Sequence, residues 1–144
     1  MRPKFSFAAG LTALIGFALC LGAALPAAAQ PSAQFAACQK AAKTQLAINA
    51  CAGNELLLRN KQMSQIYNQL LAHAKKQPWG TAAKIQAAQK AWLAYADAYM
   101  NAEWPAPNKQ AEYGSIYPMA SALARAALVE RHIQDLSALL HTDH

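Results

Sequence analysis

Valine is nearly absent from this sequence, with Val129 as its one occurrence among 144 residues. No segment alternates polar and apolar residues with the period of two that marks a half-buried strand. From about Phe35 to the end, Ala, Leu, Gln, Lys and Glu dominate, and these residues are strong helix formers. The sequence therefore argues against a β fold and predicts an all-α protein.

Catalytic motifs are also missing. The nucleophile elbow G-x-S-x-G of serine hydrolases does not occur, and the acidic residues form no recognisable pair of the kind that glycosidases use. Among the four histidines, only His141 and His144 have the helical spacing of two metal ligands, and they fall at the fraying end of the chain. We therefore expect no enzyme activity, no metal and no cofactor.

Long apolar runs are absent except near residue 1. Arg2 and Lys4 precede an uncharged run from Phe5 to Leu25, which Pro26 ends. The three alanines at 27–29 supply the small residues that signal peptidase accepts, and this layout predicts a secretory signal peptide over residues 1–29. The mature domain, residues 30–144, is then expected to be periplasmic or secreted, with no stable membrane insertion after cleavage.

Two alternatives for this N-terminal segment remain open. The run of about 20 residues is long enough to span a bilayer as an uncleaved anchor. Cys20 could instead carry a lipid, although a lipoprotein signal requires a small residue where Leu19 stands. The alanines that precede Gln30 favour cleavage over both alternatives.

Acidic residues are scarce. From Gln30 onward, 11 Lys and Arg residues stand against 7 Asp and Glu residues, which gives a net charge of +4. A modest positive charge favours contact with anionic lipids or envelope polymers, although ordinary solubility is the simpler interpretation. Nucleic acid is not an expected partner, because an exported protein seldom meets it.

Two cysteines, Cys38 and Cys51, follow the predicted cleavage site. An even pair in an exported chain favours a disulfide, and the spacing fits no metal knuckle. Closing a loop of about 14 residues would stabilise the fold by roughly 3 kcal/mol. Because Cys38 precedes the first long helix, this bond requires the chain before Thr44 to fold back along that helix. Residues 30–34 are expected to form a frayed terminus.

Three helical segments follow from the apolar periodicity and from the helix breakers. The first covers about Thr44–Lys76, and Gly53–Asn54 could break or bend it. The second covers about Thr81–Glu103. The third follows Ser115, the expected N-cap, with Pro118 in its first turn. Apolar residues of the third segment alternate in steps of three and four, which predicts a seam against the other two. We predict a small three-helix, mainly antiparallel bundle with one disulfide.

The loop between the second and third segments is the best candidate for a binding surface. Its aromatic and acidic residues are Glu103, Trp104, Glu112, Tyr113 and Tyr117. Aromatic residues are enriched among those that dominate binding at interfaces, and long loops in compact domains are often functional. The alternative is that these aromatic residues pack on one another and cap the end of the bundle.

A longer pattern runs through the mature chain. Its first half contains Thr44-Gln45, Asn49, Cys51-Ala52, Glu55 and Tyr67. Its second half contains Q-x-A-W-x-x-Y-x-D-A over residues 89–98, then G-S-x-x-P over residues 114–118. This pattern resembles the lysozyme-inhibitor LprI-like N-terminal domain, a family of bacterial envelope domains. The resemblance covers nearly all of the mature chain and implies a small, helical, disulfide-stabilised domain.

The chain departs from that family pattern at several positions. The resemblance places the third and fourth family cysteines at Met100 and Ala124. Because both cysteines are missing together, the pattern fits the loss of one disulfide between the second and third segments. The family also often has Arg, Thr and Arg where this chain has Ala96, Val129 and His132. A polar network that includes Asp97 would then be weakened here.

The resemblance implies a function that the residues alone do not specify. We expect an exported protein-binding module similar to lysozyme inhibitors, with a lysozyme-like glycosidase or another envelope protein as its partner. The net charge of +4 gives no steering toward a cationic lysozyme, but Glu103 and Glu112 could face one. The alternative is a structural or stress-related periplasmic protein without lysozyme-inhibiting activity; a helical chaperone would require a large exposed apolar patch.

Overall fold

The computed structural model describes residues 30–78 and 81–142, and the predicted signal peptide lies outside these residues. The elements are, in chain order, α1 (Ala33–Ala41), α2 (Gln45–Ala74), α3 (Thr81–Glu103), α4 (Lys109–Tyr113), the 3-10 helix η1 (Gly114–Ile116) and α5 (Tyr117–Leu140). Every regular element in the described residues is helical, so the predicted all-α class is confirmed.

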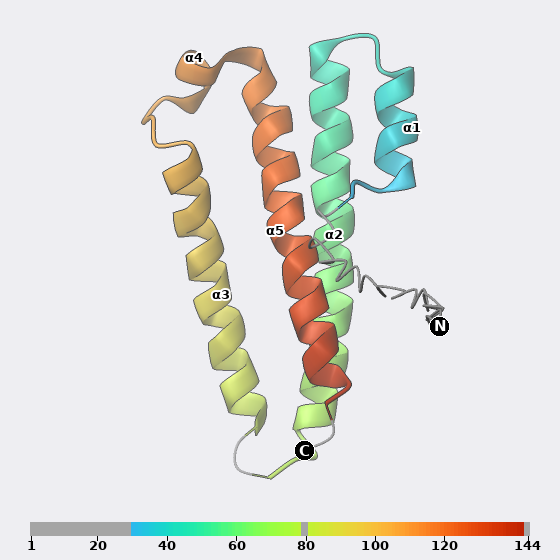
Figure 1. Ribbon diagram of the computed structural model, residues 1–144, viewed down its shortest axis with the longest axis vertical. Helices are drawn as coiled ribbons and strands as arrows, with labels where there is room; N and C mark the ends of the chain where they lie inside the picture. The colour runs from blue at the N-terminus through green and yellow to red at the C-terminus, as the bar shows by residue number, and fades with distance from the viewer. Residues whose placement is uncertain (1–29, 79–80, 143–144) are drawn as a thin grey trace, which may run out of the picture.

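The longer helices run alternately up and down the molecule (Figure 1). α1 runs opposite to α2, α3 returns along the bundle, and α5 runs parallel to α2. Two contacts at successive levels of this parallel pair are a hydrogen bond of 3.0 Å from Asn49 to the carbonyl of Ser115 and an ion pair of 2.6 Å between Arg59 and Glu130. Consecutive long helices are therefore antiparallel, as predicted, but the most extensive packing joins α2 and α5, which are parallel.

The main core lies between α2 and α5. Met63 and Leu70 of α2 are buried against Val129 and Leu136 of α5, and Trp92 of α3 packs on this cluster. Burying one such side chain stabilises a fold by about 1.5–3 kcal/mol. The predicted apolar seam of the third segment therefore does form the centre of the molecule.

α3 lies at the edge of this core. Among its residues, Ala96 is the buried one, whereas Tyr95 and Tyr99 remain 55% and 41% exposed. α3 contacts both α2 and α5, but over a much smaller surface than those two helices share. None of the helices in residues 30–78 and 81–142 combines the length and the apolar character needed to cross a bilayer.

The prediction of three helices is wrong, because α1 forms a separate helix before α2. The described residues contain four helices of nine residues or more, together with the short α4. The hydroxyl of Ser32 accepts a hydrogen bond of 3.1 Å from the backbone N–H of Phe35, which caps the start of α1. Phe35 is buried against Cys51 and Ala52. Residues 30–34, which were expected to fray, thus include a capped and packed helix start.

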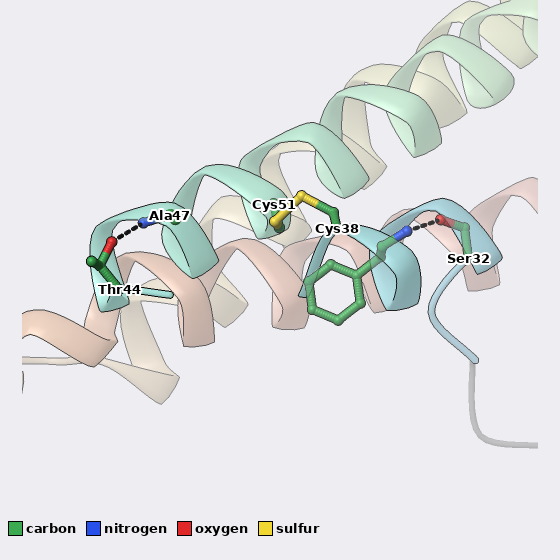
Figure 2. The surroundings of a disulfide bond; sticks show 6 residues. Ser32, Cys38, Thr44, Ala47 and Cys51 are labelled. Atoms are coloured by element: carbon green, nitrogen blue, oxygen red, sulfur yellow. Dashed lines mark hydrogen bonds between the residues drawn. A yellow bond between two sulfur atoms is a disulfide. The ribbon is translucent and has the colours of Figure 1, made fainter. Parts of the chain in front are cut away.

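The predicted disulfide between Cys38 and Cys51 is confirmed. Their Cα atoms lie 5.7 Å apart, within the usual range for a cystine. The bond joins α1 to α2 (Figure 2). Thr44 caps the start of α2 by accepting a hydrogen bond of 3.2 Å from Ala47 N–H. The chain before Thr44 therefore folds back along α2, as the position of Cys38 requires.

Two details of the helix boundaries differ from expectation. α2 continues without interruption through Gly53, since one glycine costs only about 1 kcal/mol in a helix and the packing of α2 outweighs this cost. Ser115 is not the N-cap of α5. It lies within η1, and α5 begins at Tyr117 after Ile116, whose side chain makes no capping hydrogen bond. Pro118 does lie in the first turn of α5, as predicted.

Candidate functional site

The segment between α3 and α5 forms one end of the bundle (Figure 1). α3 ends at Glu103. The ammonium group of Lys109 donates hydrogen bonds to the backbone carbonyl oxygens of Trp104 and, at 3.5 Å, of Ala106. Carbonyls at a helix end lack partners within the helix, so Lys109 satisfies groups that would otherwise depend on water.

The predicted loop contains the short helix α4. Asn108 caps it by accepting a hydrogen bond of 3.2 Å from Ala111 N–H. The chain then turns at Gly114, whose φ of +70° lies in the region that favours glycine. Asn49 of α2 donates to the carbonyl of Ser115, so this end of the molecule is attached to the start of α2 as well as to α3 and α5.

Three aromatic residues that were predicted as binding residues lie together here. The rings of Trp104 and Tyr117 meet edge to face, with centroids 5.9 Å apart and an interplanar angle of 73°. Tyr113 and Tyr117 are 5.7 Å apart at 33°. The hydroxyl of Tyr113 accepts a hydrogen bond of 3.2 Å from Ala106 N–H. Each ring is half-buried, so one part packs on its neighbours and the rest faces solvent.

The two acidic residues of this surface, Glu103 and Glu112, are exposed. Ile116, four residues after Glu112 in the chain, is 52% exposed. Among the ion pairs of the described residues, none includes Glu103 or Glu112. Lys109, the one cation between them in sequence, directs its ammonium group toward backbone carbonyls. We call the set Glu103, Trp104, Glu112, Tyr113, Ile116 and Tyr117 the aromatic end.

A second polar site lies at the start of the described chain. Arg59 of α2 binds Glu55 at 2.9 Å and Glu130 of α5 at 2.6 Å. Ser32 donates to Glu55 from its backbone N–H at 3.0 Å and from its hydroxyl. Burial by itself would raise the pKa of Glu55, but the hydrogen bonds from Ser32 and Arg59 and the positive charge of Arg59 lower that pKa below its usual value. Glu55 is therefore ionised at neutral pH although it is only 4% exposed.

Sequence reasoning did not identify this cluster. Its one local signal is the spacing of Glu55 and Arg59, because residues four apart lie on the same helix face. Glu130 lies 71 residues after Arg59 in the chain, and Ser32 lies 23 residues before Glu55. Only the packing of α1 and α5 on α2 brings the four side chains together.

The Q-x-A-W motif of α3 holds a buried histidine. Gln89 and Trp92 lie three residues apart on one face of α3, and both contact His132 of α5. The Nε2 of His132 lies 2.8 Å from the Oε1 of Gln89. Burial lowers the pKa of His132, and the nearby carboxylate of Asp135 opposes part of this effect. His132 is thus predominantly neutral near pH 7.

Asp97, for which a weakened network was expected, has a partner on α5. Arg125 pairs with it at 2.8 Å, and the side chain of Asp97 is 70% exposed. Ala96 and Val129, two of the positions at which the chain departs from the family pattern, are buried with 0% and 1% exposure. These positions therefore contribute apolar packing here, while Asp97 meets a cation from a different residue.

The described residues contain no group of three or more His, Cys, Asp or Glu side chains that could hold a metal ion, and His144 lies outside them. A model of the family described as lysozyme inhibitor LprI matches residues 36–136, more than half of the chain. No curated protein and no solved structure matches the chain.

Proposed function

Because the chain belongs to the lysozyme inhibitor LprI family, we propose that it is an exported protein-binding module that inhibits a lysozyme-like glycosidase. The observation that carries this proposal is the family match, which extends from α1 to near the end of α5 and so includes the aromatic end. An inhibitor needs a surface that binds its target, and it needs no catalytic group of its own.

The aromatic end is the proposed binding surface. Half-buried rings of Trp104, Tyr113 and Tyr117 are held by one another, so little conformational freedom is lost when a partner covers their exposed parts. Aromatic residues in such positions often dominate the binding energy of an interface. Ile116 adds exposed apolar surface beside them.

The charge of this surface suits a cationic partner. Glu103 and Glu112 are exposed, and Lys109 is engaged with backbone carbonyls. The local charge is therefore negative although the domain has a net charge of +4. Glu103 also occupies the last residue of α3, where the helix dipole disfavours a carboxylate. A carboxylate at this position does not stabilise the helix, whereas it would attract a cationic lysozyme.

The test is the rate of peptidoglycan hydrolysis by a cationic lysozyme in the presence of the exported protein. We expect inhibition, and we expect the double variant Glu103→Lys with Glu112→Lys to inhibit at least about tenfold more weakly. Asp135→Lys is the matched control, since Asp135 is an exposed acid on α5 away from the aromatic end. An unchanged hydrolysis rate at excess protein would contradict the proposal and favour a structural or stress-related role in the envelope.

A further inference from the structure

The residues that precede α1 are attached to α2. The Nη2 of Arg59 donates a hydrogen bond of 3.0 Å to the backbone carbonyl of Gln30. Two residues later, Ser32 donates to both carboxylate oxygens of Glu55. The first described residues thus follow a defined path into the cluster of Glu55, Arg59 and Glu130, which we call the N-terminal cluster.

The N-terminal cluster contains one negative charge in excess. Two carboxylates, Glu55 and Glu130, share the single guanidinium of Arg59. The side chains of Glu55, Glu130 and Arg59 are 2%, 21% and 13% exposed. Within the described residues no other cation forms an ion pair with either carboxylate. A largely buried charge without a full counter-charge is unfavourable, so the cluster has capacity for one more cation.

We propose that the N-terminal cluster binds the α-ammonium group of the mature chain, which is created when the signal peptide is cleaved after Ala29. The nitrogen of Gln30 belongs to the same residue as the carbonyl that Arg59 binds, and backbone geometry keeps the two atoms within about 4 Å. Gln30 also lines the same pocket as Glu55, Arg59 and Glu130. The charged residues that line this pocket are Glu55 and Arg59 from α2 and Glu130 from α5.

Cleavage changes the charge of the backbone nitrogen of Gln30. In the precursor the nitrogen of Gln30 is an uncharged amide, and after cleavage it becomes a cation beside an excess carboxylate. The disulfide between Cys38 and Cys51 also forms only in an oxidising compartment. Both events act on α1, because the disulfide joins it to α2 and the N-terminal cluster holds the residues that cap its start. Export and processing therefore complete the attachment of α1, which remains weaker in the reduced precursor.

The experiment compares two exported proteins, each expressed as the full chain with its own signal peptide. One is unaltered, and the other has Gly-Ser-Gly inserted between Ala29 and Gln30, which moves the new ammonium group away from the cluster. Intact mass establishes where each product begins. We expect the unaltered product to melt about 3–5 °C higher at about pH 6 and the difference to vanish near pH 10, because α-amino groups lose their charge near pH 8.

Two controls isolate the charge. In a Glu130→Gln background the excess carboxylate is gone, so the inserted and uninserted products should melt at the same temperature. Cyclisation of Gln30 to pyroglutamate by glutaminyl cyclase forms a bond from the α-nitrogen to Cδ, breaks the Cδ–Nε2 bond and releases ammonia. This product has no ammonium group at unchanged length, and it should melt like the inserted form.

Equal melting temperatures of the two products at about pH 6 would overturn the proposal, and so would an unaltered product that begins at another residue. The proposal rests on cleavage after Ala29, which belongs to the proposed export of the protein. It does not depend on lysozyme, since melting is measured without a partner. A protein that fails to inhibit lysozyme but shows the pH-dependent difference would refute the inhibitor function alone.

Discussion

The imidazole ring of His132 lies flat on the indole ring of Trp92, with ring centroids 4.0 Å apart and planes inclined by 5°. Trp92 belongs to α3 and His132 to α5, and Gln89 of α3 holds the same imidazole through a hydrogen bond. α3 shares little surface with the other helices, so this stack is a principal attachment of α3 to the core.

The protein should lose stability as the pH falls below about 6.5, the usual pKa of histidine. Because burial lowers the pKa of His132 in the folded chain, the unfolded chain takes up the proton first. For one group the loss is at most about 1.4 kcal/mol per pH unit. Urea unfolding across this range measures it. His132→Phe keeps a flat ring on Trp92 without titrating, so its free energy of unfolding should vary less, and an identical pH dependence would refute this account.

Glu55→Gln should lower the free energy of unfolding by about 1–3 kcal/mol, because the neutral amide leaves Arg59 with one carboxylate fewer and weakens the bonds from Ser32. The pKa of Glu55 is lowered by its partners, so the stability that it contributes is complete above about pH 4.3 and is lost as the pH falls further. Glu112→Gln, at an exposed position, is the matched control and should change stability by less than about 0.5 kcal/mol. Urea unfolding at neutral pH compares the two.

Replacing Cys38 and Cys51 together by Ala should lower the free energy of unfolding by roughly 3 kcal/mol, because the unfolded chain is no longer constrained. Native protein without the predicted signal peptide, residues 1–29, should show no free sulfhydryl when it is labelled without reductant, since Cys38 and Cys51 are bonded. A labelled native protein would show that this bond does not form, and a double variant with an unchanged melting temperature would show that it does not stabilise the domain.

Met100→Cys combined with Ala124→Cys should form a second disulfide between α3 and α5. The contacts of Trp92 with His132 and of Asp97 with Arg125 show that the two helices are antiparallel. Moving eight residues along each helix from the stacked pair brings Met100 to the level of Ala124. Intact mass after alkylation, with and without reductant, detects the bond. If both thiols react with the alkylating reagent under oxidising conditions, the register inferred from the family resemblance is wrong.

Trp104→Ala and Tyr113→Ala test whether the aromatic end recognises a partner or only caps the bundle. We expect each variant to weaken inhibition of lysozyme at least about tenfold while the free energy of unfolding falls by less than about 1 kcal/mol. Tyr113→Phe, which removes the bond from Ala106 N–H but keeps the ring, should inhibit nearly as well as the unaltered protein. A large loss of stability in both alanine variants would favour capping.

The helical class, the disulfide and the seam of α5 were predictable from sequence because each depends on local composition or on a short spacing. The near absence of valine argues against strands, an even pair of cysteines in a chain that is predicted to be exported favours a bond, and steps of three and four place Val129 and Leu136 on one face. The bounds of α3, 81–103, agree with the segment predicted at about these residues, since Pro78 and Gly80 precede it and Pro105 follows it in the sequence.

Tertiary structure decided the rest. α1 is a helix because Ser32 donates a hydrogen bond to Glu55 and Phe35 is buried against Cys51. A nine-residue segment taken alone does not reveal either contact. α2 and α5 are parallel because α3, which lies between them in the sequence, runs in the opposite direction to both.

The polar sites also differ in how far the sequence alone determines them. Sequence placed the aromatic and acidic residues between Glu103 and Tyr117 in one stretch, because they are neighbours along the chain. The N-terminal cluster joins Arg59 to Glu130, 71 positions apart, and the aromatic stack joins Trp92 to His132, 40 positions apart. Which side chains meet over such separations depends on how the helices pack, and helical periodicity specifies a face of a helix but not the residue that will cover it.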